Sequence, residues 1–338
     1  MQATAVEDPS GVAAARRTAT DVAARQGMDA AAIGRVALVA TEMATNLLKH
    51  AGRGTLLAGP WESGTELLAL DRGPGMADIA TCRRDGFSTA RSAGEGLGAI
   101  ARQSALFEIF SRPGLGTALL ARVGPRPPHR EHAGGGPACG DGRAGNGPAW
   151  GAVSVALAGE EACGDAWGVR PLRGGLALMV ADGLGHGPAA ALAATAALRC
   201  FLAGEEARPP ATTLEAMHAA LRSTRGAAAA VAHLRGATVG FAGIGNIAGL
   251  AQAGGETRRM VSLNGTLGHV ARRFQEFPVT MAAPPLMVLH SDGIASGWRL
   301  EDYPGLAVAH PALIAGVLFR DFARARDDAT VLVARGGA

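Results

Sequence analysis

A stretch rich in glycine and proline divides this 338-residue chain into two parts and limits what it can fold into. Residues 124–149 read GPRPPHREHAGGGPACGDGRAGNGPA and show almost no apolar periodicity. Such a segment buries too little apolar surface to offset the entropy lost on ordering, so we expect a mobile linker. Each flanking part is long enough to bury a core of its own. The sequence therefore predicts two domains, over residues 1–123 and 150–338.

The composition excludes several classes of protein. Hydrophobic residues make up 48% and charged residues 18%, which is typical of a globular chain. The net charge is only +3 and the arginines are scattered, which argues against nucleic-acid binding. The four cysteines form no CxxC pair, so neither a zinc site nor a disulfide framework is indicated. No apolar run reaches the roughly 18 to 20 residues of a membrane span, and the acidic start is unlike a signal peptide. We expect a cytoplasmic protein with no membrane and no nucleic-acid partner.

The first part of the chain predicts two helices followed by a sheet. Apolar residues recur at helical spacing over 12–27 and 31–50, and glycines at 52 and 54 end the second helix. Strand-like runs follow. This order is typical of an α+β arrangement. The predicted strands are 54–58, 66–70, 105–110 and 117–122.

The second part predicts many strands and few helices, which favours stacked sheets with helical layers outside, again in the α+β class. The predicted helices are 188–202, 213–225 and 311–320. The predicted strands are 151–157, 175–181, 228–233, 237–243, 247–253, 258–262, 286–291 and 329–334.

Four short stretches in this second part each place an aspartate at the end of a hydrophobic run. They read GD (164–165), DGLGHG (182–187), SDG (291–293) and DDAT (327–330). Taken singly, each aspartate fits a turn or a strand cap, but four such strand ends together are hard to obtain by accident. Hard cations such as Mg²⁺ and Mn²⁺ prefer carboxylate, carbonyl and water ligands, and two of them activate water for attack on a phosphate ester. The pattern indicates a two-metal hydrolytic centre.

Another set of residues in the first part fits a nucleotide site. Glu42 and Asn46 lie four residues apart on one helix and therefore share a face. Three glycine-rich stretches follow, DRGPGM (71–76), GEGLG (94–98) and GLGT (114–117). Each element is weak alone, whereas their order and spacing are more specific.

This first part resembles the Bergerat ATP-binding fold of histidine kinases and DNA gyrase (the GHKL class), and most closely the anti-sigma serine kinases of the RsbT and RsbW type. The resemblance covers residues 10–123. It implies that Asn46 ligates a magnesium ion on the phosphates of ATP and that Glu42 orients or deprotonates the attacking hydroxyl.

The same resemblance implies the remaining nucleotide contacts. Asp71 would accept a hydrogen bond from the adenine amino group, and Thr117 would close the adenine pocket. Gly73 and Gly75 would let the backbone approach the base. The phosphate lid would be formed by Gly94, Gly96 and Gly98, with the following helix N-terminus. Lys49 is the only lysine of the chain, so a site built on a P-loop lysine or a protein-kinase strand lysine is excluded.

The second part resembles the type 2C (PPM) metal-dependent serine/threonine phosphatases, in the bacterial branch typified by SpoIIE, RsbU and RsbX, and so implies an αββα sandwich. By that likeness, Asp165, Asp182 and the Gly183 carbonyl hold one metal, and Asp182, Asp292 and Asp327 hold the other. Asp328 receives a lower weight, because eukaryotic relatives carry asparagine there. Their phosphate-clamping arginine has no obvious equivalent in this chain. Further segments also resemble the RsbX type, and they contain Asn246, Asn264 and His269. For His186, a role in the turn after Asp182 is favoured over a role as a ligand.

Together, the two resemblances imply a protein of the bacterial partner-switching or stressosome pathways. The leading expectation is a phosphatase acting on phosphorylated STAS-domain proteins of the RsbS and RsbR kind, with Mn²⁺ or Mg²⁺ in the phosphatase and ATP with Mg²⁺ in the first domain. One alternative is a bifunctional enzyme in which the first domain is also an active serine kinase. Another is a docking protein for a sigma factor or STAS protein, without turnover.

Overall fold

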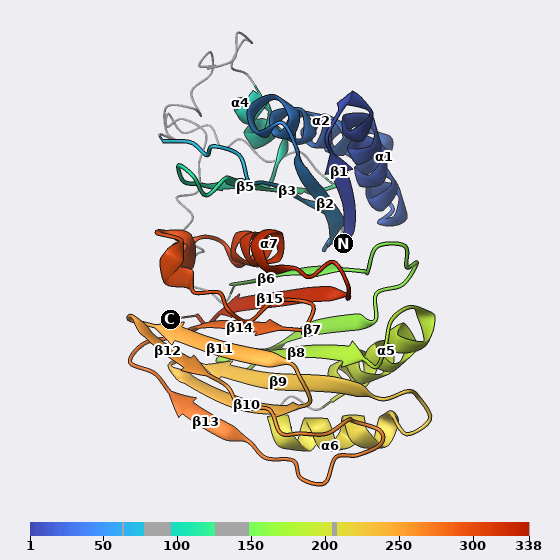
Figure 1. Cartoon of the computed structure of the whole chain (residues 1–338), viewed down its shortest axis with the longest axis vertical. Coiled ribbons are helices and arrows are strands. Elements are labelled where there is room, and N and C mark those ends of the chain that lie inside the picture. The colour runs from blue at the N-terminus through green and yellow to red at the C-terminus, as the bar shows by residue number, and fades with distance from the viewer. Residues whose placement is uncertain (63, 78–95, 126–148, 205–207, 338) are drawn as a thin grey trace. The chain divides into compact units, whose positions relative to one another are not determined.

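The computed structural model of the chain contains two compact units (Figure 1). The first unit consists of residues 1–143 with 303–309, and the second of residues 144–302 with 310–338. Most of the predicted linker, residues 126–148, lies outside the part that the structure describes. The described residues are 1–62, 64–77, 96–125, 149–204 and 208–337.

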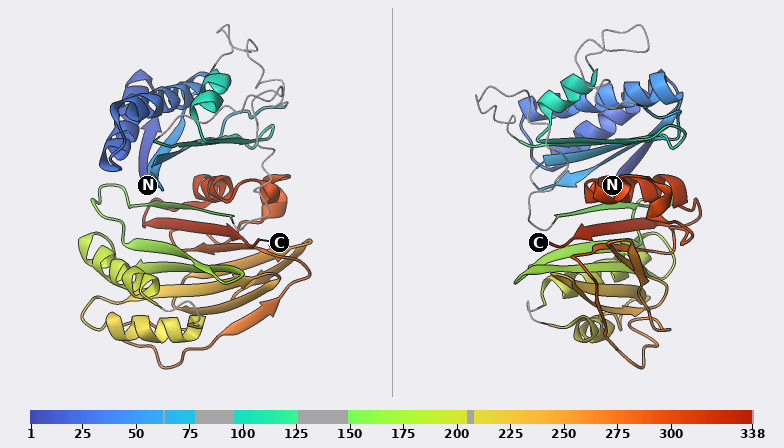
Figure 2. Two further views of the ribbon diagram at one scale, coloured as in Figure 1. Left: turned by 180° about the vertical axis from the view of Figure 1, so that it is seen from behind. Right: turned by 90° about the vertical axis from the view of Figure 1, so that its left-hand side faces the viewer.

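The first unit is an antiparallel sheet covered by helices on one face, as expected (Figures 1 and 2). The strand order is β1-β2-β3-β5-β4, and every neighbouring pair is antiparallel. Apolar residues of the helices pack with those of β2, β3 and β5 into one core. The strands are β1 (Gln2–Val6), β2 (Gly54–Trp61), β3 (Gly64–Asp71), β4 (Leu106–Ser111) and β5 (Thr117–Val123); the helices are α1 (Pro9–Arg25), α2 (Ala30–Asn46) and α4 (Gly96–Gln103).

Helix α2 is the central helix of this unit. The Asp29 carboxylate caps its start by accepting from the Ala32 N–H. Its last turns widen into a π-helix, η1 (Leu47–Ala51), and Gly52 ends it in the left-handed conformation at φ 75°. The combined helix, 30–51, is long and apolar enough by composition to cross a membrane. Its buried side chains, however, belong to the core of the first unit, which is what a central helix of a folded domain requires.

The second unit contains two antiparallel sheets of five strands that pack face to face (Figures 1 and 2). Side chains from both sheets form the core between them. One sheet has the order β13-β10-β9-β8-β7, and the other β12-β11-β14-β15-β6. The strands are β6 (Ala149–Val155), β7 (Asp165–Leu172), β8 (Gly175–Gly183), β9 (Ala227–Arg235), β10 (Thr238–Ile244), β11 (Ala248–Ala253), β12 (Glu256–Arg259), β13 (Phe277–Thr280), β14 (Leu286–His290) and β15 (Ala329–Arg335).

Helices cover the outer face of each sheet, so the unit is the expected αββα sandwich. Helices α5 (Pro188–Leu202) and α6 (Pro210–Ala220) bury a second core against β8 and β9. Helix α7 (Pro311–Phe322) packs on β6 and β15 of the other sheet. Each of the three helices has a proline in its first turn, where a missing N–H costs nothing. Short 3₁₀ turns η2 (Leu300–Asp302) and η3 (Leu306–Val308) precede α7.

The structure corrects several expected element boundaries. The helix predicted over 213–225 is α6, which ends at Ala220, so 221–225 form the turn into β9. Edge strands β1 and β13 were not predicted, because most of their side chains are exposed or half-buried and give a weak apolar pattern. Strand β7 was not predicted either.

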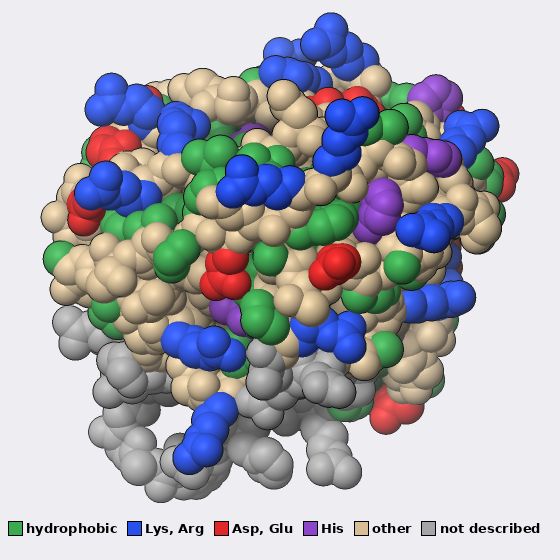
Figure 3. Space-filling model, turned by 90° about the horizontal axis from the view of Figure 1, so that it is seen from below, with side chains coloured by type: hydrophobic (Ala, Val, Ile, Leu, Met, Phe, Trp, Pro, Cys, Tyr) green, Lys and Arg blue, Asp and Glu red, His purple; other side chains and the backbone are tan. Residues whose placement is uncertain are grey.

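On the face of the molecule in Figure 3, Lys and Arg side chains are spread out and form no stripe.

His233 on β9 is a buried core histidine, and it should make the second unit sensitive to acid. Burial lowers its pKa from 6.5 to about 4, and its Nε2 has no hydrogen-bond partner among the described residues. The unfolded chain therefore binds a proton that the folded protein resists, so stability falls as pH drops from about 6.5 to 4. Between pH 7 and pH 4, the free energy of unfolding of His233→Gln should fall by about 2 to 3 kcal/mol less than that of the unsubstituted protein. Urea titrations at pH 7 and pH 4 measure it, and an unchanged difference would contradict the assignment.

Candidate functional site

The four predicted aspartates of the second unit lie at strand termini on both sheets. Asp165 begins β7 and is paired in register with Asp182 near the end of β8. Asp292 follows β14, and Asp327 precedes β15, which is the antiparallel neighbour of β14. The sequence interpretation was wrong in placing Asp165 and Asp327 at the ends of hydrophobic runs, because both stand before their strands. In antiparallel pairs the start of one strand meets the end of the next, so Asp165 lies beside Asp182 in one sheet, and Asp292 and Asp327 lie at the same end of the other.

The carboxylates are close enough to raise one another's pKa. Burial raises the pKa of Asp182 to about 8, and the charges of Asp165, Asp292 and the 327–328 pair add to the shift. Burial likewise raises the pKa of Asp165 to about 7, against the lowering effect of hydrogen bonds from Ser291 and Thr330. The pKa of Asp327 is raised by burial and then by Asp292. The cluster therefore has a surplus of negative charge that a cation would neutralise.

Two oxygens of this cluster are left without a hydrogen bond. Asp165 Oδ2 accepts from Ser291 Oγ at 2.6 Å, and Asp292 Oδ2 accepts from Asn246 Nδ2 at 2.7 Å. The other oxygen of each, Oδ1, is buried and has no partner among the described residues. A buried, unsatisfied carboxylate oxygen is costly, so such atoms mark where an ion or water belongs.

Asp328 has a different role from its neighbours. Its Oδ1 accepts from the Leu157 N–H at 2.7 Å, and its Oδ2 accepts from the Gly164 N–H at 2.8 Å. Both oxygens are therefore used to fasten the 157–164 loop, and the side chain is only 2% exposed. The lower weight given to Asp328 agrees with this structural role.

Glycines beside the aspartates are required by close packing. A Cβ on Gly183 would run into the carbonyl oxygen of Ala190 in α5, and a Cβ on Gly164 would lie 2.7 Å from Asp328 Oδ2. The Gly183 N–H donates to the Gly164 carbonyl at 2.9 Å, which joins the segments that carry Asp182 and Asp165. Backbone proximity thus sets the spacing of these two carboxylates.

The donor set fits hard divalent cations that keep part of their water shell. Within the described ranges, no group of three His, Cys, Asp or Glu side chains forms a metal-binding cluster by itself. Mg²⁺ is typically held by one or two carboxylates plus waters and substrate oxygens, so a closed protein cage is not needed. The residues present, Asp165, Asp182, Asp292 and Asp327 with the Gly183 backbone, match that chemistry in residue type.

Of the other residues named in the sequence analysis, one contacts an aspartate of the cluster and the rest have other contacts or are exposed. Asn246 reaches the site through Asp292. His269 Nε2 lies 3.1 Å from the Thr224 carbonyl, at the turn before β9, whereas Asn264 is exposed. His186 Nδ1 lies 2.5 Å from Glu160 Oε1, so the imidazole is engaged outside the aspartate cluster.

A buried chain of hydrogen bonds that the sequence did not reveal positions Asp165. Trp298 Nε1 donates to His290 Nε2 at 3.4 Å, and His290 Nδ1 lies 2.8 Å from the Ser291 carbonyl. Ser291 Oγ accepts from the Thr330 N–H at 3.0 Å and donates to Asp165. Ser291 and Asp165 are 126 residues apart, and no local pattern reports such a contact.

The first unit contains the second candidate site, on α2 and the start of α4. A Cβ on Gly96 would lie 3.0 Å from Glu42 Oε2 and 3.8 Å from Asn46 Oδ1, so these three residues meet. Asn46 Nδ2 is buried and has no hydrogen-bond partner among the described residues. Gly98 lies in the first turn of α4, and Gly94 lies outside the described residues.

The predicted adenine-binding residues also lie together. Asp71, at the end of β3, is paired with Thr117 of β5, and its Oδ1 accepts from the Gly73 and Thr117 N–H groups at 2.8 and 3.1 Å. A Cβ on Gly73 would lie 2.7 Å from the Ala51 Cβ, which brings this loop against the end of η1. Gly75 has φ +74° and lies against the Arg112 carbonyl. Close backbone packing alone already requires both glycines.

Both parts of the chain are similar to known protein families. Residues 5–123 match the family of the histidine kinase-like ATPase domain, and residues 173–336 match Stage II sporulation protein E (SpoIIE). The serine/threonine-protein kinase RsbT of Bacillus subtilis is 32% identical over 114 residues, which cover 32% of this chain and 86% of RsbT.

Solved structures are also similar to this chain. One, described as "The bacterial stressosome: a modular system that has been adapted to control secondary messenger signaling", is 29% identical, with a TM-score of 0.52 over 56% of this chain and 99% of that one. A structure of RsbX in complex with magnesium is 17% identical, with a TM-score of 0.47 over 55% of this chain and 93% of RsbX. The chain belongs to the RsbT family of histidine kinase-like ATPases, and it joins that domain to a SpoIIE-type serine/threonine phosphatase domain.

Proposed function

We propose that this protein removes phosphate from phosphoserine or phosphothreonine of STAS-domain proteins, and that its first domain binds ATP. The observation that carries the phosphatase assignment is the cluster of Asp165, Asp182, Asp292 and Asp327, with mutually raised pKa values and two orphaned buried oxygens. The SpoIIE match covers the segments with Asp182, Asp292 and Asp327. We propose the domain limits 1–123 and 150–338, with 124–149 as the linker.

The residues present suggest how the reaction is supported. Two bound Mg²⁺ or Mn²⁺ ions would supply an activated water and neutralise charge on the phosphoryl oxygens. Asp165 and Asp182, with the Gly183 carbonyl, would hold one ion, and Asp182, Asp292 and Asp327 the other. Ser291 fixes the Asp165 carboxylate and Asn246 fixes that of Asp292, so the Oδ1 of each would be available to a bound ion. Such fixed ligands favour binding because little order has to be gained.

Phosphorylated STAS-domain proteins are the proposed partners because both likenesses point to partner-switching systems. RsbT is named a serine/threonine-protein kinase, and the 29% identical structure is described as belonging to the stressosome. We propose an RsbS- or RsbR-like partner, a sigma-factor contact through the first domain, and action in the cytoplasm.

Manganese-dependent phosphate release from a phosphorylated STAS-domain protein tests this function. We expect release by the full chain that is abolished by EDTA and by Asp182→Asn, and retained by Asn46→Ala. Retention in Asn46→Ala assigns the activity to the second unit. If no phosphate is released from any phospho-STAS protein while Mn²⁺ is bound, the chain is a docking protein and the proposal is wrong.

A second activity, phosphorylation of the same partner, is favoured by the site on α2. Glu42, Asn46 and Gly96 meet there, and the RsbT likeness spans 86% of that kinase. We expect Asn46→Ala to weaken binding of ATP with Mg²⁺ by at least about tenfold, because the variant removes the amide oxygen that is proposed to ligate the ion. Nucleotide titration by calorimetry measures this. Transfer of ³²P from ATP to the STAS protein, lost in Glu42→Gln, would establish the kinase; unchanged ATP affinity in Asn46→Ala would contradict the site.

Ser291→Ala should weaken metal binding without removing a ligand. The variant removes the hydrogen bond that orients Asp165 and leaves the Thr330 N–H without its acceptor. Loss of such an orienting partner typically costs about 10- to 100-fold in metal affinity. Mn²⁺ titrations followed by calorimetry measure the change, and the exposed Ser10 on α1 offers a control as Ser10→Ala. An affinity within twofold of the unsubstituted protein would contradict the orienting role.

A further inference from the structure

The proposed substrate carries a phosphate dianion, and the aspartate cluster itself offers it no positive side chain. Lys49, in the first unit, is the only lysine of the chain, so a permanently cationic side chain in the second unit must be an arginine. Three described arginines stand in segments that adjoin the aspartates: Arg225, Arg324 and Arg326. The structure distinguishes among them.

Arg225 lies on the turn before β9, against the loop that follows Asp182. Strand β9 starts at Ala227, whose partner on β8 is Gly183. The Leu184 N–H donates to the Gly226 carbonyl at 3.0 Å, which joins the loop to the turn. A Cβ on Gly185 would lie 3.4 Å from Arg225 Nη1, so the guanidinium rests beside the 182–187 loop.

The turn that carries Arg225 is held in one shape. Thr224 Oγ1 donates to the Leu221 carbonyl at 2.8 Å and accepts from the Gly226 N–H at 3.0 Å. Gly226 has φ +84°, and a Cβ there would lie 2.6 Å from the Leu267 carbonyl. The backbone at Arg225 is thus fixed before any ligand arrives.

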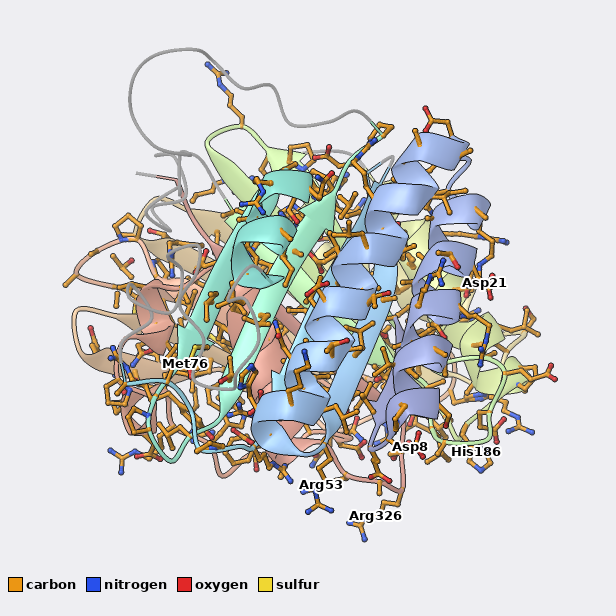
Figure 4. The ribbon with its side chains drawn as sticks, turned by 90° about the horizontal axis from the view of Figure 1, so that it is seen from above. Asp8, Asp21, Arg53, Met76, His186 and Arg326 are labelled. Carbon is orange, nitrogen blue, oxygen red and sulfur yellow. The ribbon has the colours of Figure 1, made fainter. Side chains whose placement is uncertain are left out.

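Arg225 also differs from Arg324, whose side chain already has a partner. Its side chain is exposed and makes no hydrogen bond or ion pair with any residue in the described ranges. Arg324 Nη1 already donates to the Asp292 carbonyl at 3.1 Å. Arg326 is exposed and extends outward from the ribbon in Figure 4. Only Arg225 combines a free guanidinium with contact to the Asp182 loop.

We propose that Arg225 binds the phosphate group of the substrate. This rests on the proposed function of the second unit. A planar guanidinium offers two parallel N–H donors to two phosphoryl oxygens, a geometry that lysine does not provide. The ligand class is a phosphate monoester dianion, with inorganic phosphate as the product that shares the site.

Steady-state kinetics of the full chain with Mn²⁺ test the proposal, using p-nitrophenyl phosphate as substrate and inorganic phosphate as competitive inhibitor. For Arg225→Gln we expect KM and the phosphate inhibition constant to rise about 10- to 100-fold. Arg225→Lys should recover part of both losses. The Mn²⁺-induced rise in Tm should stay unchanged, which separates loss of phosphate binding from damage to the metal site. Arg222→Gln, on the same turn and exposed, is the matched control.

The possible outcomes distinguish a failure of the Arg225 proposal from a failure of the proposed phosphatase function. An active parent protein whose Arg225→Gln variant keeps its phosphate inhibition constant within twofold would overturn the role of Arg225 and leave the phosphatase standing. A parent protein that releases no phosphate in the presence of Mn²⁺ would overturn the proposed function itself. A lower Mn²⁺-induced Tm shift in Arg225→Gln would instead make Arg225 a structural support of the loop, and would also overturn the proposal.

Discussion

Asp182→Asn is expected to abolish phosphate release and, at the same time, to raise the melting temperature of the metal-free second unit. Asparagine has nearly the shape of aspartate but carries no charge. In the metal-free protein, burial and four neighbouring carboxylates raise the pKa of Asp182 to about 8, so folding at neutral pH must either protonate this carboxyl or hold its charge at a cost. Removing that charge should stabilise the unit by about 1 to 2 kcal/mol, which is about 2 to 8 °C.

The same substitution should lower phosphatase activity at least about a thousandfold, because bound ions provide several kcal/mol of charge stabilisation and Asp182 is the ligand proposed to bridge them. Calorimetry in EDTA measures the stability, and phosphate release with Mn²⁺ measures the activity. The exposed Asp302→Asn, in the same unit, also removes one carboxylate charge and serves as control. A metal-free Asp182→Asn protein that melts below the unsubstituted protein would contradict the proposed repulsion among the carboxylates, because Asp182 would then be stabilising the fold.

Gly183→Ala should strongly destabilise the second unit. The added Cβ would run into the carbonyl oxygen, carbonyl carbon and Cα of Ala190, all backbone atoms of α5 that cannot turn away. Helix α5 buries Ala193, Ala197 and Phe201 against the sheet, so moving it disturbs that core. We expect a loss of about 3 kcal/mol, seen as a Tm lower by about 6 to 12 °C.

The displacement should also reduce phosphatase activity, because Gly183 directly follows Asp182 and joins it to the Asp165 segment through the Gly164 carbonyl. Gly297→Ala is the matched control, since a Cβ there meets no atom within 4 Å and its φ is not positive. Thermal unfolding of both variants checks the prediction. Equal melting temperatures for the two would show that α5 accommodates the methyl group.

Much of the architecture was predictable from local pattern. Helix α5 has the bounds expected from its alanine-rich run, 188–202, and most strands fall within a few residues of their predicted positions. The errors lie where apolar pattern is weak. The edge strands β1 and β13 expose much of their length, and β7 begins on Asp165, which looks like the end of a run when read without its partner β8.

The candidate sites were predictable in residue type and less so in geometry. The motif order indicated the aspartates and the residues on α2, and the structure brings both sets together. The assignment of Asp328 to the 157–164 loop, across 164 residues from Gly164, had no local signal. The same holds for the contact of Arg225 with the Gly185 loop.

By itself, the sequence determined the division into two domains, the elements of each and the chemistry on offer, because apolar periodicity, turn residues and carboxylate motifs are properties of neighbouring residues. The tertiary structure alone decided which strand starts meet which strand ends, which carboxylate oxygens stay unsatisfied, and how far burial raises the pKa of Asp165 and Asp182. Several of these features depend on contacts between residues more than a hundred positions apart, and on the water that those contacts exclude, and neither is recorded in local pattern.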